Sequence, residues 1–167
     1  MKKRLHPDVW IHPFLMWAII IAGVVAAFDD FHETLLYKPP VLLYLLGGMC
    51  FVYWIYFFIR GISVNTEASF PASRISRLIT SGVYEKVRHP LYSADIVLAW
   101  GVFIIYPLSA LFVSATWLTI IMVLWAYLEE QSLKQSFGIA YDTYQKHTRA
   151  FIPIKKNVYH KTSDTEK

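Results

Sequence analysis

The stretch LYSADIVLAWGVFIIYPLSALFVSATWLTIIMVLWAYLEE, residues 91–130, contains two apolar segments separated by little more than Pro107. Crossing about 30 Å of hydrocarbon takes roughly 20 helical residues. The second segment, 108–128, is long enough for a membrane span, and the first, 91–106, is short for one. The minimal link predicts a tight helical hairpin with hardly any loop at its far side.

The composition of the whole chain is that of a membrane protein. Its 167 residues are 56% hydrophobic, with a mean hydropathy of +0.39, which is too apolar for a soluble domain. Two further apolar segments, 10–28 and 41–59, precede the hairpin. We therefore expect an all-α fold, a multi-pass membrane bundle of about four spans.

The net charge of +4 does not indicate a nucleic-acid partner, because the basic residues flank the apolar segments as they do in cytoplasmic loops. Cys50 is the single cysteine and lies within an apolar segment. This excludes a disulfide framework and a cysteine metal cluster, and we expect no metal. The ordinary interpretation of Cys50 is a small buried apolar side chain.

Lysine and arginine gather at the N-terminus, between residues 60 and 90 and after residue 133, whereas the link 28–40 is mainly acidic. The positive-inside rule then puts both termini and the 60–90 loop in the cytoplasm. An N-terminal signal peptide is the less favoured alternative, because Trp10, His12 and Pro13 interrupt its apolar part. The short chain favours a prokaryotic inner-membrane protein, and nothing in it indicates an oligomeric state.

The region after the fourth span changes character without a break signal. Leu133, Phe137, Tyr141 and Tyr144 recur at helical spacing between polar residues. This pattern predicts an amphipathic helix at the cytoplasmic interface that continues the fourth span and is kinked at Gly138. The polar end, 155–167, is expected to be a flexible tail.

The hairpin begins at a polar corner, Arg88, His89 and Pro90. Proline suits the first turn of a helix, so the third span should begin at Pro90. Its free backbone N–H groups and dipole, with Arg88 and His89 beside them, could hold a carboxylate. In the plainer interpretation, Arg88 only reaches the lipid headgroups and His89 only caps the helix.

Three carboxylates accompany this corner. Asp95 lies about one turn into the third span, where it needs a partner and is either a functional acid or a hydrogen-bonded structural one. Glu129 and Glu130 end the fourth span, and the short hairpin returns them close to Arg88. Adjacent helical positions point about 100° apart, so one carboxylate can face a cavity while the other meets water. A solvated pair at the end of a span is the ordinary alternative.

Four motifs occur in order: LITSGVY, RHPLY, EEQSL and FGIAYDTY, followed by a proline at 153. Together they resemble the integral membrane methyltransferases typified by isoprenylcysteine carboxyl methyltransferase and phosphatidylethanolamine N-methyltransferase. The resemblance covers about residues 76–153. It implies transfer of the methyl group of S-adenosylmethionine to a lipidic acceptor at the cytoplasmic membrane face. The cofactor-binding residues that it implies are Leu78, Ile79, Tyr84, Arg88, His89, Pro90, Leu91, Tyr92 and Glu129, with Arg88 and Glu130 also supporting the others.

The implied acceptor is either a carboxylate or an amine. Only an amine needs a proton acceptor, for which Glu130 and Asp95 are the candidates. The sequence departs from the family pattern at Ser76, where a histidine is common, at Ala94, where a glycine is common, and at Trp125. Because isoprenylcysteine enzymes carry an arginine at the position of Trp125, a prenylcysteine carboxylate is the less favoured substrate.

We expect one membrane methyltransferase domain, 1–154, with its cofactor-binding half at about 76–153. Two other functions fit parts of the sequence. Membrane sterol and enone reductases share the C-terminal half-domain but bind NADPH and are generally longer. A non-enzymatic four-helix membrane protein would bind neither nucleotide.

Overall fold

The computed structural model describes residues 12–31, 34–65 and 76–153. Their helices are α1 (Pro13–Asp30), α2 (Val41–Val64), α3 (Val83–Lys86), α4 (Pro90–Ile105), α5 (Ser109–Phe137) and α6 (Ile139–His147). Three of them, α1, α2 and α5, are long and apolar enough to cross a membrane, and α4 is an apolar helix of 16 residues. The predicted all-α class with apolar spanning helices is confirmed.

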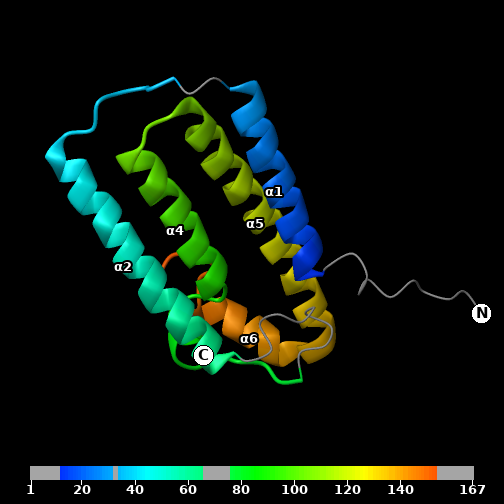
Figure 1. The fold of residues 1–167 in the computed structure, drawn as a ribbon. Helices are drawn as coiled ribbons and strands as arrows, with labels where there is room; N and C mark the ends of the chain where they lie inside the picture. The colour runs from blue at the N-terminus through cyan, green and yellow to red at the C-terminus, as the bar shows by residue number, and fades with distance from the viewer. Residues whose placement is uncertain (1–11, 32–33, 66–75, 154–167) are drawn as a thin grey trace, which may run out of the picture.

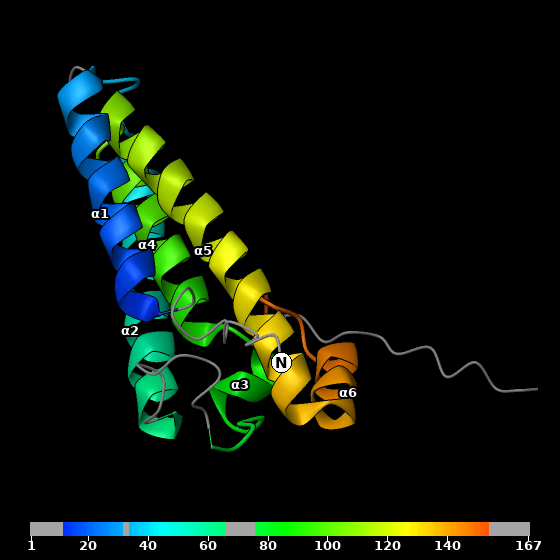
Figure 2. The ribbon, with the colours of Figure 1, turned by 90° about the vertical axis from the view of Figure 1, so that its right-hand side faces the viewer.

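The long helices form a row rather than a closed bundle. α2 packs against α4, α4 against α5, and α5 against α1, and Figure 1 shows them side by side in that order. Figure 2 shows α3 and α6 together at one end of the row. At the other end the α4–α5 turn is tied to the α1–α2 link, since Leu36 N donates to Pro107 O at 2.8 Å and Ser109 N to Thr34 O at 3.1 Å.

The helix starts follow local signals. α4 begins at Pro90, as predicted, and α1 begins at Pro13 after His12, whose Nδ1 accepts a hydrogen bond from Phe14 N at 3.3 Å. The predicted start of the first span at residue 10 lies outside the described residues. α2 runs to Val64, five residues beyond the predicted end at 59, because its last turn packs on the protein: Val64 contacts the cluster that contains Val83.

The predicted continuous helix after Glu129 is wrong in one respect. α5 continues to Phe137, but Gly138 has a φ of +52° and ends it, so that α6 is a separate helix. A left-handed backbone at this position favours glycine and turns the chain. Figure 1 shows α6 lying across the end of the row. The apolar face of α6 covers protein, since Tyr141 is 1% exposed.

α2 and α4 approach closely because glycines line their contact. A Cβ atom at Gly101 would lie 2.6 Å from the Cβ atom of Cys50, and one at Gly61 would lie 2.8 Å from Leu91 Cδ2. Small residues allow this kind of close helix packing in membranes. Cys50 is half-buried in this contact, which fits the expectation of an apolar packing residue.

The predicted polar tail, 155–167, and the first eleven residues, on which the signal-peptide alternative depends, lie outside the described residues.

Candidate functional site

The polar corner is built by a short turn and a backbone pairing. Gly82, with a φ of +66°, leads into α3, after which Val87 is extended. The chain then pairs with the segment that follows α6: Arg88 N donates to Arg149 O at 2.8 Å and His89 N to Ala150 O at 3.0 Å. The residues that lead into α4 are therefore held by the segment that follows α6.

Arg88 and Glu130 form the centre of the site. Glu130 Oε1 accepts hydrogen bonds from Arg88 Nε at 2.8 Å and from Arg88 Nη2 at 2.7 Å, and its Oε2 accepts one from Gln145 Nε2 at 2.7 Å. The third nitrogen of Arg88, Nη1, donates to the backbone carbonyl of Thr148. This ion pair is almost buried, with side-chain exposures of 9% for Arg88 and 11% for Glu130. It joins the start of α4, the end of α5 and the end of α6.

His89 lies between the two glutamates. Its Nε2 is 3.1 Å from Glu130 Oε1, and its Nδ1 is 3.7 Å from Glu129 Oε2. A carboxylate can only accept hydrogen bonds, so Nε2 carries the proton that is shared with Glu130. The ring is stacked on Tyr92, with centroids 5.6 Å apart and an interplanar angle of 2°, and also on Phe151, at 5.7 Å.

Glu129 has a different environment from Glu130. Its Oε1 accepts a hydrogen bond from the Tyr92 hydroxyl at 2.6 Å. The 3.7 Å between its Oε2 and His89 Nδ1 exceeds a hydrogen-bond distance. Of the two neighbouring carboxylates, Glu129 is the one with an oxygen available for another group.

A small cavity of about 50 Å³ lies beside the ion pair, and Leu78, Ile79, Tyr84 and Arg88 are among its lining residues. Burial raises the pKa of the Tyr84 hydroxyl, and burial likewise raises the pKa of Tyr144, which also lines the cavity. Both hydroxyls therefore stay protonated at neutral pH and can donate. Tyr144 donates to the backbone carbonyl of Tyr84, and the Tyr84 hydroxyl accepts from Asn65 Nδ2 at 3.2 Å.

Two of the predicted site residues face α2 instead of the glutamates. Leu91 packs over Gly61, and Asp95 Oδ1 accepts a hydrogen bond from Trp54 Nε1 of α2 at 2.9 Å. Positions four apart lie on one helix face, so both point the same way. Tyr92 and Ile96 lie on the neighbouring face, about 100° round the helix, and pack against a cluster from α1 and α5.

Four residues of the site were not predicted. Gln145 and Thr148 complete the ion pair, Phe151 stacks on His89, and Asn65 reaches Tyr84. Gln145 lies four residues after the apolar Tyr141 on the same face of α6, a spacing that could have indicated it. The other three have no local signal, because they reach the site through the fold.

Trp125, at the position of the family arginine, is 6% exposed and packs with Met16, Ile20 and Met122. Among the described residues its Nε1 has no hydrogen-bond partner. The position that carries a cation in isoprenylcysteine enzymes is here part of an apolar cluster next to Tyr92.

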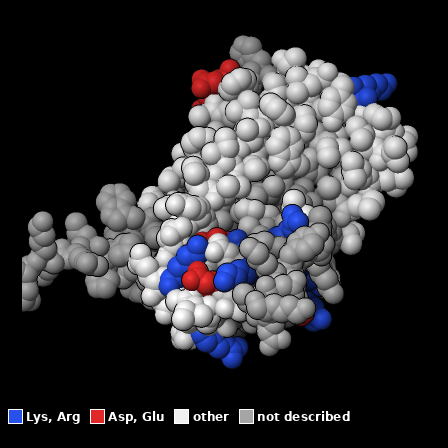
Figure 3. Space-filling model, turned by 180° about the vertical axis from the view of Figure 1, so that it is seen from behind, with Lys and Arg blue, Asp and Glu red and all other residues white. Residues whose placement is uncertain are grey.

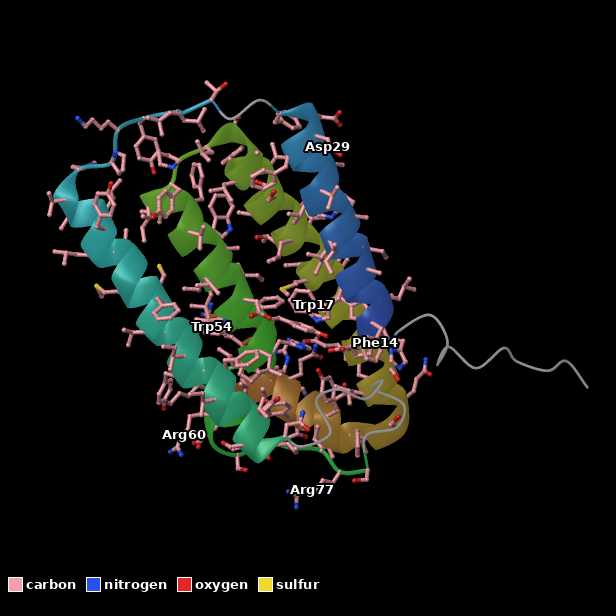
Figure 4. All side chains as sticks on the ribbon, viewed as in Figure 1. Phe14, Trp17, Asp29, Trp54, Arg60 and Arg77 are labelled. Carbon is pink, nitrogen blue, oxygen red and sulfur yellow. The ribbon has the colours of Figure 1, made fainter. Side chains whose placement is uncertain are left out.

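Most of the charged side chains of the described residues lie near the two ends of the row. Figure 3 shows acidic and basic side chains gathered at the end that carries α6, while the body of the helices is almost uncharged on the face in view. Figure 4 shows Arg60 and Arg77 at this end and Asp29 at the other. An uncharged body between two charged ends is the distribution of a protein that spans a bilayer.

The fold and this cluster define an all-helical membrane protein with one polar site at an end of its helices. The family model for phospholipid methyltransferases matches residues 40–140, more than half of the 167 residues. The chain belongs to this family, and the resemblance given by the four motifs is confirmed. Membership indicates methyl transfer to a lipid substrate. Neither the curated proteins nor the solved structures gave a match.

Proposed function

We propose that this protein transfers the methyl group of S-adenosylmethionine to a lipidic acceptor. One observation carries the proposal: the chain belongs to a lipid methyltransferase family, and the start of α4 and the end of α5 meet in a buried charged cluster where the motifs predict the cofactor. The sulfonium of the cofactor supplies both the methyl group and its leaving group. The chain itself then has to bind, orient and exclude water, which needs no catalytic triad.

The residues present fit such a cofactor. Its amino-acid part carries an ammonium group, for which Glu129 Oε2 is the available acceptor. Its carboxylate would need donors, and the first turn of α4, which begins at Pro90, presents backbone N–H groups that no earlier helical turn can bind. Tyr84, Leu78 and Ile79 line the adjoining cavity and would contact the rest of the molecule.

Arg88 and Glu130 support the site rather than bind the cofactor directly in this proposal. All three nitrogens of the Arg88 guanidinium donate within the protein, and Glu130 receives donors from three residues. Their pairing fixes His89 and Tyr92 in front of Glu129. They are positioning residues, while His89, Tyr92 and Glu129 would touch the cofactor.

The acceptor in this proposal is a lipid that reaches the site laterally from the bilayer. If it is an amine, a side chain must accept a proton. Asp95 has the less occupied carboxylate of the two candidates, because its only hydrogen bond among the described residues is with Trp54, whereas Glu130 already accepts from Arg88, His89 and Gln145. A carboxylate acceptor would need neither.

We place the site at the cytoplasmic face, with both termini in the cytoplasm, because Arg60 and Arg77 lie at this end and Asp29 at the other. Residues 1–154 would form one domain, whose cofactor-binding half is about 76–153. We also propose the inner membrane of a prokaryote as its location.

Ligand-induced stabilisation tests the cofactor. We expect S-adenosylmethionine and S-adenosylhomocysteine to raise the melting temperature of the purified protein in detergent, by mass action on the folded state. NADPH should leave it unchanged. Stabilisation by NADPH alone would favour the reductase alternative, and no stabilisation by any of the three would refute both enzymatic functions.

Glu129→Gln sharpens the test, because the amide keeps the shape and can still accept from Tyr92 but loses the charge. We expect this variant to fold but no longer to be stabilised by S-adenosylmethionine or S-adenosylhomocysteine. Glu85→Gln removes a carboxylate from the exposed surface of α3 and should behave like the wild type. Equal ligand shifts in both variants would exclude Glu129 as a cofactor residue.

The acceptor is identified by incubating the protein with methyl-labelled cofactor and a total lipid extract. The labelled lipid is first isolated by chromatography. Mild base then releases the label of a methyl ester as volatile methanol, whereas the label of a methylated amine stays in the non-volatile fraction.

A further inference from the structure

α2 presents a hollowed apolar face on the side turned away from α4. The residues that contact α4, such as Gly47 and Gly61, lie on one side of this helix. A groove of about 720 Å³ runs along the other side, lined by Tyr44, Leu45, Gly48, Met49, Val52 and Tyr56, among others. Successive helical residues are about 100° apart, which puts positions 45, 49, 52 and 56 roughly opposite the α4 contact.

Gly48 is the residue that hollows the groove. A Cβ atom at the neighbouring Gly47 would lie 2.4 Å from Ile105 Cδ1, so α4 requires that glycine. A Cβ atom at Gly48 would have no atom of the described residues within 4 Å. A glycine inside a helix is less stable than an alanine. Since helix packing does not explain Gly48, its effect is to open the groove.

A cluster of cationic and hydroxyl groups closes one end of the groove. Lys86 Nζ reaches across from α3, donates to the Tyr56 hydroxyl at 3.1 Å and lies 5.1 Å from the centroid of its ring. Arg60 is one helical turn beyond Tyr56 and interacts electrostatically with the same hydroxyl. Lys86 and Arg60 are both exposed, and Figure 4 shows Arg60 pointing away from the bundle.

We propose that this face binds one anionic phospholipid of the surrounding bilayer, outside the methyltransferase site. Its acyl chain would lie in the groove, and its phosphate would contact Lys86, Arg60 and the Tyr56 hydroxyl. The length of the groove fits this occupant. Positions 44 to 56 span about 18 Å of helix, which is long enough for an extended acyl chain. Arg60 directly follows the apolar segment 41–59, so the cationic end lies at the depth of the headgroups.

Charge complementarity selects the headgroup. Two cations converge on one hydroxyl, and no carboxylate of the described residues forms an ion pair with either. A lipid with net negative charge satisfies them better than a zwitterionic one, because juxtamembrane Lys and Arg attract anionic lipids by about 1 kcal/mol each.

Native mass spectrometry of the full-length protein in detergent tests the proposal without any assay of methyl transfer. Phosphatidylglycerol is titrated into the wild type, and phosphatidylcholine of the same chain length serves as the zwitterionic comparison. We expect one retained phosphatidylglycerol molecule and weaker retention of phosphatidylcholine. Equal retention of the two lipids would overturn the assignment of the phosphate to Lys86 and Arg60.

Two variants test the two parts of the site. Gly48→Leu should abolish retention by filling the groove, whereas Ala22→Leu, which also introduces a leucine but at an exposed position of α1, should retain the lipid. Lys86→Gln should weaken retention of phosphatidylglycerol about fivefold, and Lys38→Gln, at the other end of the molecule, should not change it.

Circular dichroism and melting curves establish that each variant is folded. Undiminished lipid retention in folded Gly48→Leu would refute the groove as the binding site. A dimer in the wild-type spectra that is lost in Gly48→Leu would show that a second copy of the chain covers this face, and it would also overturn the proposal.

Discussion

The two sides of α4 are built on different physics. Toward α2, shape dominates: Gly101 lies against Cys50 and Gly61 against Leu91, with glycines that leave no room for a side chain. Toward α5, at the start of the helix, charge dominates, since Arg88 and His89 meet Glu130 at 2.7 Å and 3.1 Å. In lipid, helices associate through close packing and hydrogen bonds, because burying apolar surface gives no advantage over lipid contact.

The contact of α4 with α2 is therefore a structural scaffold, whereas its contact with α5 forms the candidate site. The contact with α2 fixes α4 by steric fit, and its polar pairs, Trp54 with Asp95 and Tyr53 with Ser93, are satisfied within the interface. The contact with α5 gathers ionisable groups in one place. Burying such groups in a membrane protein costs free energy, so their presence indicates a function. The effects of substitutions on the two sides should accordingly differ in size and in physical cause.

The largest effect is expected for Arg88→Met. Methionine fills similar space but leaves Glu130 almost buried without its cation. Breaking a buried ion pair in this way typically costs about 3–5 kcal/mol. We expect a loss of that size in the free energy of unfolding, measured by titration with a denaturing detergent.

Arg149→Met is the matched control, because the side chain of Arg149 is exposed. It should change stability by less than about 0.5 kcal/mol. If Arg88→Met were no more destabilised than this control, the charged side of α4 would not hold the C-terminal half together.

Gly101→Leu tests the other side of α4. A Cβ atom alone would come within 2.6 Å of the Cβ atom of Cys50, so a leucine must push α2 and α4 apart. Overpacking a fitted contact costs typically 1–3 kcal/mol, and we expect a value near the upper limit, from the same detergent titration. Gly48→Leu adds an identical side chain on α2 where the described residues leave open space. Comparable losses in both variants would contradict the steric account.

The hairpin and the start of α4 could be predicted because their signals are local. Pro107 lies between two apolar segments, and Pro90 begins the first of them. Each proline restricts the backbone at its own position. The proximity of Arg88 to Glu130 followed from the hairpin, since two antiparallel helices return the chain to its starting side. Gly138 was recognised as a disturbance, but the left-handed φ that ends α5 there was not foreseen.

The order of the helices in the row could not be predicted in the same way. Helices that are apolar all round show no preferred face, so the sequence does not reveal that Leu91 and Asp95 face α2 while Tyr92 faces α1 and α5. The return of residues 149–151 beside Arg88 uses backbone hydrogen bonds, which any sequence can form. Thr148 and Phe151 therefore join the site without a motif, whereas the spacing of Gln145 from Tyr141 is a signal that the sequence does carry.

Tyr92→Phe should have an intermediate effect. It removes the 2.6 Å hydrogen bond to Glu129 but keeps the ring stacked on His89. Hydrogen bonds between membrane helices are worth about 1–2 kcal/mol at most, and we expect a loss in that range. Tyr127→Phe, at a tyrosine that is 61% exposed, should leave stability unchanged. A loss of stability confined to Tyr92→Phe would show that the hydrogen bond with Glu129 stabilises the protein. Equal losses in both variants would show that it does not.

Asp95→Asn should disturb stability least. Asparagine can still accept from Trp54 Nε1 through its carbonyl oxygen, so the 2.9 Å contact with α2 is retained, and we expect a change below about 1 kcal/mol in the same titration. Ligand-induced stabilisation should also persist, because Asp95 faces α2 and not Glu129. The rate of methyl transfer then separates its two possible roles, since loss of a positioned proton acceptor lowers the rate about 100-fold or more. With an amine acceptor, we expect such a loss at unchanged stability. An undiminished rate would make Asp95 a structural acceptor that belongs to the scaffold side of α4 alone.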